Sequence, residues 1–175
     1  MRTMARAVVL VLVVAFVAGL WDARYGREDP PARSGAPFRT EPVERSRRSR
    51  PPPELVSVET TERDGYDRVL FTFKGPTPGY QVRYVSQITD QGGRKLPLDG
   101  QAFLAVAFQP ARAHDRGGQA TFPEGDLDSG LPAVRQVRFA GDFEGQVSFG
   151  IGVANRGGFR VVELDDPNRV AVDVR

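Results

Sequence analysis

Few side chains in this sequence could carry out chemistry. His114 is the only histidine, and cysteine is absent. A Ser-His-Asp arrangement needs a serine presented on a strained turn, and no Gly-x-Ser-x-Gly segment occurs. One imidazole also cannot supply the ligands of a zinc hydrolase. We therefore predict that His114 is not catalytic. Two readings of it stay open, a contact to a ligand and a bond to the backbone of its own loop.

Carboxylates offer two further patterns, and neither is complete. Asp142 and Glu144 share a face of any extended segment, whereas a glycosidase needs its two carboxylates on either side of the scissile bond. A turn between strands, with Gly141 and Gly145 in unusual backbone conformations, is the better interpretation. Asp126-Leu-Asp128-Ser-Gly130 imitates the start of a calcium loop, but Val137 stands where the last acidic ligand belongs. The sequence thus predicts no enzyme, no metal site and no cofactor.

What remains is a binding surface. Sugar recognition uses flat aromatic faces beside polar and guanidinium groups, and Tyr80 and Tyr84 fall on one face of a predicted strand. The alternative for both tyrosines is a place in the core with only the hydroxyl in water. A compact polar loop follows further along the chain. The predicted ligand-binding residues are Arg112, His114, Asp115, Tyr80, Tyr84 and Asp142.

The elements that must position these residues are strands. From Leu55 onward apolar residues recur with a period of two, and glycine-rich turn clusters separate the runs. Eight short strands at this spacing predict an all-β sandwich or barrel. The best helix candidate is a single turn at residues 126–131. The apolar runs are Val56–Val58, Val69–Phe73, Tyr80–Tyr84, Leu104–Phe108, Val137–Phe139, Val147–Val153, Phe159–Leu164 and Val170–Val174.

Two of these runs form an internal repeat. Val69-x-Phe71-x-Phe73 leads through a glycine-proline turn to Gly79-Tyr-Gln-Val82, and Val147-x-Phe149-x-Ile151 leads through a glycine turn to Gly158-Phe-Arg-Val161. If the repeat is more than the general likeness of two hairpins, the fold has two similar halves packed face to face.

The C-terminal hairpin carries a family resemblance. Phe159–Leu164 and Val170–Val174 flank a tight Asp-Asp-Pro-Asn turn, and the pair resembles the closing hairpin of AMIN domains, which are cell-wall-targeting modules. The AMIN-like branch of actinobacterial envelope proteins is closer still, over about residues 54–175. The other matching segments are Asp67-Arg-Val-Leu-Phe71, Pro78-Gly-Tyr80, Pro110-Ala-Arg-Ala-His-Asp115 and Ala140-Gly-Asp-Phe-Glu-Gly145. The resemblance implies a β-sandwich of two similar small antiparallel sheets.

The N-terminal part predicts export and a linker. Arg2 and Arg6 precede an apolar run, Ala7 to Trp21, which is short for a membrane span of about 20 residues. Residues 1–21 are therefore a signal peptide or an N-terminal membrane anchor, with residues 7–21 as the tether in the second case. Lipidation is excluded because no cysteine follows. Residues 22–53, rich in proline and arginine, predict a disordered tail, and residues 54–175 the AMIN-like domain.

Charge separates the two parts of the chain. Residues 1–53 hold 10 arginines and 5 acidic residues, whereas residues 54–175 hold 14 basic and 17 acidic residues. The folded part is mildly acidic, which argues against nucleic acid as a partner. The arginines at 45–50 either attract anionic wall polymer or belong to a solvated linker.

Together these observations predict a non-catalytic, extracytoplasmic binding module of the bacterial cell envelope. The resemblance implies peptidoglycan or another cell-wall glycan as its partner, so that the module localises itself or a second protein there. The alternative is a structural or protein-interaction β-domain that pairs with an envelope protein through an exposed strand edge.

Overall fold

The structure is a computed structural model that describes residues 36–123 and 125–175. Within these residues it contains strands and no helix, and none of its segments is a helix able to cross a membrane. The predicted signal or anchor (1–21) and residues 22–35 of the predicted tail lie outside the described residues. The strands are β1 Val43–Arg45, β2 Glu54–Arg63, β3 Tyr66–Lys74, β4 Tyr80–Val85, β5 Ile88–Thr89, β6 Lys95–Leu96, β7 Ala102–Phe108, β8 Leu127–Asp128, β9 Val134–Phe143, β10 Gln146–Val153, β11 Phe159–Leu164 and β12 Arg169–Val174.

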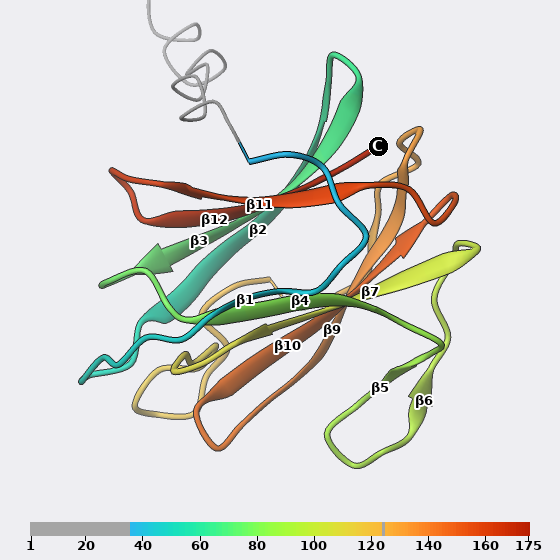
Figure 1. The fold of residues 1–175 in the computed structure, drawn as a ribbon. Coiled ribbons are helices and arrows are strands. Elements are labelled where there is room, and N and C mark those ends of the chain that lie inside the picture. The colour runs from blue at the N-terminus through green and yellow to red at the C-terminus, as the bar shows by residue number, and fades with distance from the viewer. Residues whose placement is uncertain (1–35, 124) are drawn as a thin grey trace, which may run out of the picture. The chain divides into compact units, whose positions relative to one another are not determined.

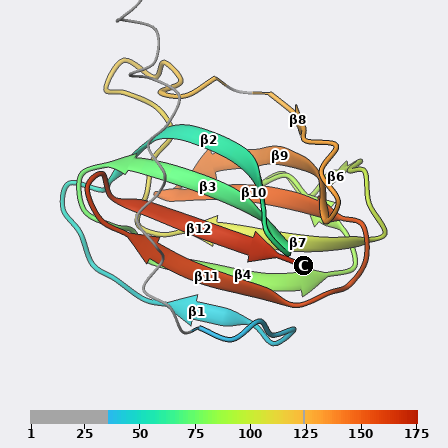
Figure 2. The same ribbon diagram turned by 90° about the horizontal axis from the view of Figure 1, so that it is seen from above.

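Two antiparallel sheets pack face to face, which confirms the predicted β-sandwich (Figures 1 and 2). One sheet has the order β1-β4-β7-β10-β9-β8 and the other the order β11-β12-β3-β2. The small pair β5-β6 projects from the six-stranded sheet (Figure 1). All eight predicted strands are present as the long strands. The sequence did not predict β1, β5, β6 and β8, because two or three residues are too few to show a period.

The best helix candidate, residues 126–131, is not helical. Leu127 and Asp128 form β8 instead, pairing with Val137 and Gln136 of β9. Gln136 donates a side-chain hydrogen bond to Asp128 at 2.7 Å, so the pairing is held from both backbone and side chain. An isolated helical turn would fix several backbone dihedrals for a single hydrogen bond, so pairing with β9 is the more stable arrangement for these residues.

The internal repeat corresponds to a shared architecture. β2, β3, β4 and β7 of the first half match β9, β10, β11 and β12 of the second in order and role. In each half the first hairpin lies in one sheet and the next two strands cross to the other. Each sheet therefore contains strands of both halves, so the expectation of one half per sheet is corrected. Without the edge strands β1 and β8, the two sheets have four strands each.

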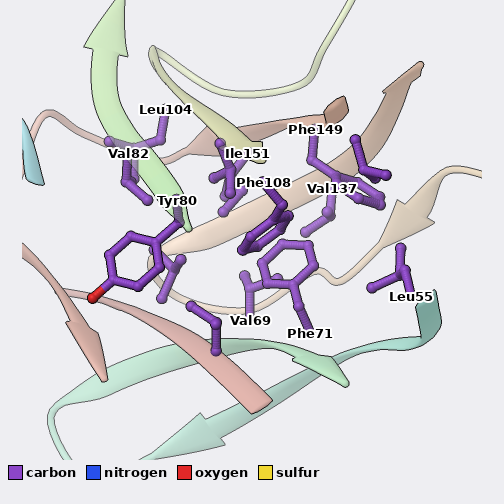
Figure 3. Packing of buried hydrophobic residues seen from close by; sticks show 14 of the residues in the cluster. Leu55, Val69, Phe71, Tyr80, Val82, Leu104, Phe108, Val137, Phe149 and Ile151 are labelled. Carbon is purple, nitrogen blue, oxygen red and sulfur yellow. The ribbon is translucent and has the colours of Figure 1, made fainter. Parts of the chain in front are cut away.

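The core lies between the sheets and is built largely of aromatic and branched side chains (Figure 3). Phe71 of β3 and Phe149 of β10 come from opposite sheets, and their ring centroids lie 5.0 Å apart. Phe108 of β7 contacts Phe71 at 4.9 Å in an edge-to-face arrangement. These geometries are the favoured ones for aromatic pairs. The repeat thus places its central phenylalanines against each other.

Residues 36–53, which the sequence predicted to be disordered, form an ordered strap over the side of the sandwich where β4 and β11 lie (Figure 2). β1 pairs with β4, and Arg39 exchanges two backbone hydrogen bonds with Phe159 of β11, each 2.8 Å long. Arg47 forms an ion pair with Glu163 at 2.6 Å. Composition predicted disorder because the strap has little apolar surface to bury. It is ordered instead by hydrogen bonds to the open edge strands of the two sheets.

We expect a chain that starts at Glu54 to melt about 10 °C below one that starts at Ala36. The shorter chain loses several backbone hydrogen bonds and the Phe38 ring, whose stabilisation together is about 2–3 kcal/mol after ordering costs. Thermal unfolding followed by circular dichroism measures the difference. Melting temperatures within about 2 °C of each other would mean that the strap is only a passive linker, as its composition suggested.

Charged residues on the outer face of the four-stranded sheet form a buried cluster. Asp173 of β12 is fully buried and accepts hydrogen bonds from Arg68 of β3 at 2.7 and 3.1 Å and from Arg160 of β11 at 2.8 Å. The Phe38 ring of the strap lies 4.5 Å from the guanidinium carbons of Arg160 and Arg175. The strap, the closing hairpin and β3 are thereby joined through one carboxylate.

Candidate functional site

The structure brings His114 and Asp142 together. The Nδ1 atom of His114 lies 2.5 Å from Oδ2 of Asp142, and the same oxygen accepts the backbone N–H of Ala113 at 2.6 Å. The Asp142 side chain is nine-tenths buried, whereas that of His114 is half exposed. A buried carboxylate therefore orients a half-exposed imidazole, and Nε2 of that ring has no hydrogen-bond partner among the described residues, so it can bond a ligand.

Arg112 and Asp115 lie beside this pair but are engaged elsewhere. Arg112 forms an ion pair with Glu54 of β2 at 2.5 Å, and its backbone pairs with the same strand. Asp115 accepts the backbone N–H groups of Gly117 and Gln119, which hold its pKa below the ordinary value. These two residues fix the loop that presents His114.

Tyr80 and Tyr84 share a strand face, as predicted, but it is the inner one. Tyr80 is buried and donates its hydroxyl to Glu163 at 3.1 Å. Tyr84 packs edge-on against Phe159 and donates its hydroxyl to the carbonyl of Gly157 at 2.8 Å. Burial raises the pKa of both phenols, and the Glu163 carboxylate adds to the effect on Tyr80. Of the two interpretations left open, the core position is the correct one.

The predicted turn is present but shorter than expected: Glu144 and Gly145, with φ angles of 52° and 75°, join β9 to β10. Gly141, with a φ of 137°, lies within β9 beside a bulge, and Asp142 is a strand residue paired with Val147. Asp142 and Glu144 therefore do not share one extended segment. Across residues 36–123 and 125–175, no group of three or more acidic or histidine side chains is arranged to hold a metal ion.

A groove that the sequence did not predict lies on the outer face of the six-stranded sheet. The arm formed by residues 86–100, which contains β5 and β6, folds back over β10 at this face. Ile88 of the arm is buried against Gly150, where an added Cβ would lie 2.7 Å from the isoleucine side chain. A Cβ added at Gly152 would likewise collide with the backbone carbonyl oxygen of Asp99. The arm can therefore rest on the sheet only because these two positions have no side chain.

The space between the arm and the sheet has a volume of about 400 Å³. A second hollow of about 210 Å³ continues it toward β1 and shares Gln81, Ala107 and Gln146 with it. The floor consists of small side chains from β7 and β10, and the walls are rich in amides. Polar side chains from Gln81, Gln87, Gln91, Gln146 and Ser148 line the groove, and Ala107 forms part of its floor.

Phe143 stands beside this groove. It pairs with Gln146 across the β9–β10 hairpin, and paired residues project from the same face of a sheet. Its side chain is 61% exposed, and it is the one exposed large hydrophobic side chain in the part of the chain that the structure describes. A solvated aromatic ring next to a trench of amides is a surface suited to a sugar, because a pyranose presents an apolar face and a rim of hydroxyls.

Two charged residues of the groove are already engaged. Asp90 of the arm accepts the backbone N–H and the guanidinium of Arg94, and these bonds hold its pKa below the ordinary value. Glu44 of β1 accepts the Gln81 amide at 3.3 Å. Gln81 in turn accepts from Nε of Arg83 at 3.3 Å. A chain of polar side chains thus crosses from β4 to the strap.

A separate hollow of about 380 Å³ lies at the end of the sandwich near the β2–β3 turn. Tyr66, Pro132, Ala133, Asn155 and Arg175 contribute to its wall. It is more apolar than the groove and shares none of its residues, so it provides a position for control substitutions.

One sequence signal could have located the arm. Ser148, Gly150 and Gly152 alternate along β10 with the buried Phe149 and Ile151, so every outward position is small. A solvated strand face normally carries larger polar residues, and a run of small ones indicates that something packs closely there. The identity of the covering segment could not be read in the same way, because it depends on tertiary contact.

Comparison with protein families places this architecture in a known group. The family model of the AMIN-like domain matches residues 53–175, which include every strand from β2 to β12 and the arm. No curated protein and no solved structure matches the chain.

AMIN-like domains are envelope-associated binding and targeting modules and are not known for catalysis. The matched range covers well over half of the sequence, and both the sandwich and the groove fall within it apart from the β1 wall. On this basis the chain belongs to the AMIN-like domain family.

Proposed function

We propose that this protein is a non-catalytic, extracytoplasmic module that binds a cell-wall glycan, with peptidoglycan as the first candidate, and localises itself or a partner to the envelope. The observation that carries the proposal is the amide-lined groove with the exposed Phe143 at its side. Membership of the AMIN-like family supports a cell-wall ligand.

The chemistry of the groove fits a polyhydroxylated chain. Each amide side chain both donates and accepts, so Gln81, Gln91 and Gln146 match hydroxyls that do the same. The groove extends from the arm to β1, so it can accommodate several linked sugar units. Contacts of this kind are individually weak, because each replaces a hydrogen bond to water. We therefore expect modest affinity that depends on repeated units along a polymer.

His114 stays a proposed ligand contact. It is separate from the groove, because Asp142, which holds it, pairs with the buried Val147, whereas Phe143 pairs with the groove residue Gln146 and so projects from the other face of β9. A contact through His114 would therefore add a second point of attachment for a long polymer. Arg112 and Asp115 act by positioning that loop, and Tyr80 supports the wall from inside the sandwich.

Pull-down with purified cell-wall sacculi tests the groove. We expect Gln146→Ala and Phe143→Ala in the full chain each to lower the bound fraction about 3- to 10-fold, since each removes one hydrogen-bonding or stacking contact. Asn155→Ala, in the separate hollow, should bind like the unaltered chain. Binding should survive about 0.3 M salt, because hydrogen bonding and stacking are screened less than attraction by the arginine-rich N-terminal part.

Full binding by the combined Gln146→Ala and Phe143→Ala chain would refute the groove as the site. Loss of binding in His114→Ala alone would move the site to the 109–120 loop while keeping the ligand class.

A second function is favoured by the edge strand β2. It is ten residues long and lies at the edge of the four-stranded sheet. Among the described residues, the backbone groups on its open side are hydrogen-bonded near the start of the strand, where the Leu55 N–H donates to the carbonyl of Arg112. Such an edge can accept a strand from another protein. Photo-cross-linking from Glu59 in cells distinguishes the two proposals. A single envelope protein joined at this position would favour the protein-interaction module.

A further inference from the structure

Arg83 is the charged side chain of the groove that has no carboxylate beside it. It lies on β4, is exposed, and pairs across the sheet with Ala105, whose small side chain leaves the space above it open. Its Nε donates to Gln81 at 3.3 Å. In the part of the chain that the structure describes, no Asp or Glu lies within ion-pairing distance of Arg83.

Of the neighbouring charges, two belong to ion pairs, and the third, Glu44, binds a neutral amide. Asp90 has Arg94, and Arg45 of β1 lies 3.3 Å from Glu163. Glu44 binds the amide of Gln81 at the far end of the groove. The middle of the groove therefore carries one positive charge that these residues do not neutralise.

We infer that the ligand of this groove is an acidic saccharide whose carboxylate binds the terminal nitrogens of Arg83. This inference rests on the proposed function and adds the charge of the ligand to it. The contact between Nε and Gln81 fixes the direction of the guanidinium, so its two terminal nitrogens remain for a bidentate bond. The flanking amides then take hydroxyls on either side of the carboxylate.

A neutral glycan would leave this arrangement unexplained. Holding the Arg83 guanidinium in one direction costs side-chain entropy, and a hydrogen bond to water does not offset that cost. A carboxylate gains a charge-assisted bond there, and such bonds are about twice as strong as neutral ones.

Isothermal titration of the full chain with three defined probes tests the inference. The probes are a hyaluronan tetrasaccharide, which carries carboxylates, a neutral N-acetylated chitotetraose, and N-acetylglucosamine 6-phosphate. We expect the carboxylated probe to bind about 10-fold more tightly than the neutral one, and Arg83→Gln to remove that difference. Arg83→Lys should retain part of the preference for the carboxylated probe, because an ammonium keeps the positive charge but cannot form the bidentate hydrogen bond of a guanidinium.

Arg116→Gln is the matched control, since Arg116 is exposed in a loop outside the groove and should not alter the preference. Equal affinity for the neutral and carboxylated probes, or an unchanged preference in Arg83→Gln, would overturn the inference. So would a preference for the phosphate probe alone. If sacculi still bind through Gln146 and Phe143 in that case, the proposed function stands. Loss of binding to sacculi and to all three probes would instead refute the proposed function.

Discussion

Replacing Phe71 by alanine is expected to lower the free energy of unfolding by about 3–5 kcal/mol, enough to unfold much of a domain of ordinary stability. Phe71 is fully buried at the centre of the sandwich, and its ring contacts Phe149 at 5.0 Å and Phe108 at 4.9 Å. Its removal would leave a cavity that both sheets border, and strands paired on both sides cannot move in to fill it. Denaturant unfolding followed by fluorescence or circular dichroism gives the value.

Phe143→Ala is the matched control for this prediction, because it deletes the same side chain from a position that is 61% exposed. Its unfolding free energy should change by about 0.5 kcal/mol or less. If the two variants proved equally stable, the assignment of β3 side chains to the inner face would be wrong.

Replacing Asp173 by asparagine should destabilise the protein by about 3–5 kcal/mol, because it removes one partner from a buried ion cluster. Arg68 is 3% exposed and Asp173 is fully buried, so water cannot take over the lost interaction. Arg160 also loses its carboxylate, and the Phe38 ring of the strap stacks on Arg160. We therefore expect the strap to loosen together with the sheet, which hydrogen exchange at Arg39 and Phe159 would report.

Asp165→Asn tests the same chemical change at an exposed turn of the same hairpin and should leave the melting temperature unchanged. A combined Arg68→Met and Asp173→Leu chain should recover much of the lost stability, because an apolar pair needs no neutralisation. If Asp173→Asn alone were as stable as the unaltered chain, the charges of this cluster would make no net contribution to the free energy of unfolding.

The long strands and the core could be predicted from the sequence because both depend on local periodicity. Val69, Phe71 and Phe73 alternate with polar or outward residues, and the same spacing near Phe149 gives the second central strand. Such patterns need no knowledge of what packs against them. The polar loop at His114 was also found, because its residues are consecutive in the chain.

The strap was mispredicted for the opposite reason. Its residues carry no period, and the interactions that order it come from distant segments: β4, which pairs with β1, and Phe159, Arg160 and Glu163 of β11. Tyr80 and Tyr84 show a related limit, since alternation gives two residues a common face but does not say whether that face is inside.

By itself, then, the sequence determined the strands, the hydrophobic core and the all-β class, since these follow from which residues alternate. Only the tertiary structure decided that the segment at 36–53 closes the sandwich, and that an arm seated on Gly150 and Gly152 creates a groove beside Phe143 and Arg83. The physical reason is that edges, grooves and unpaired charges are defined by what lies across from them, and neighbours in space are set by the packing of distant segments.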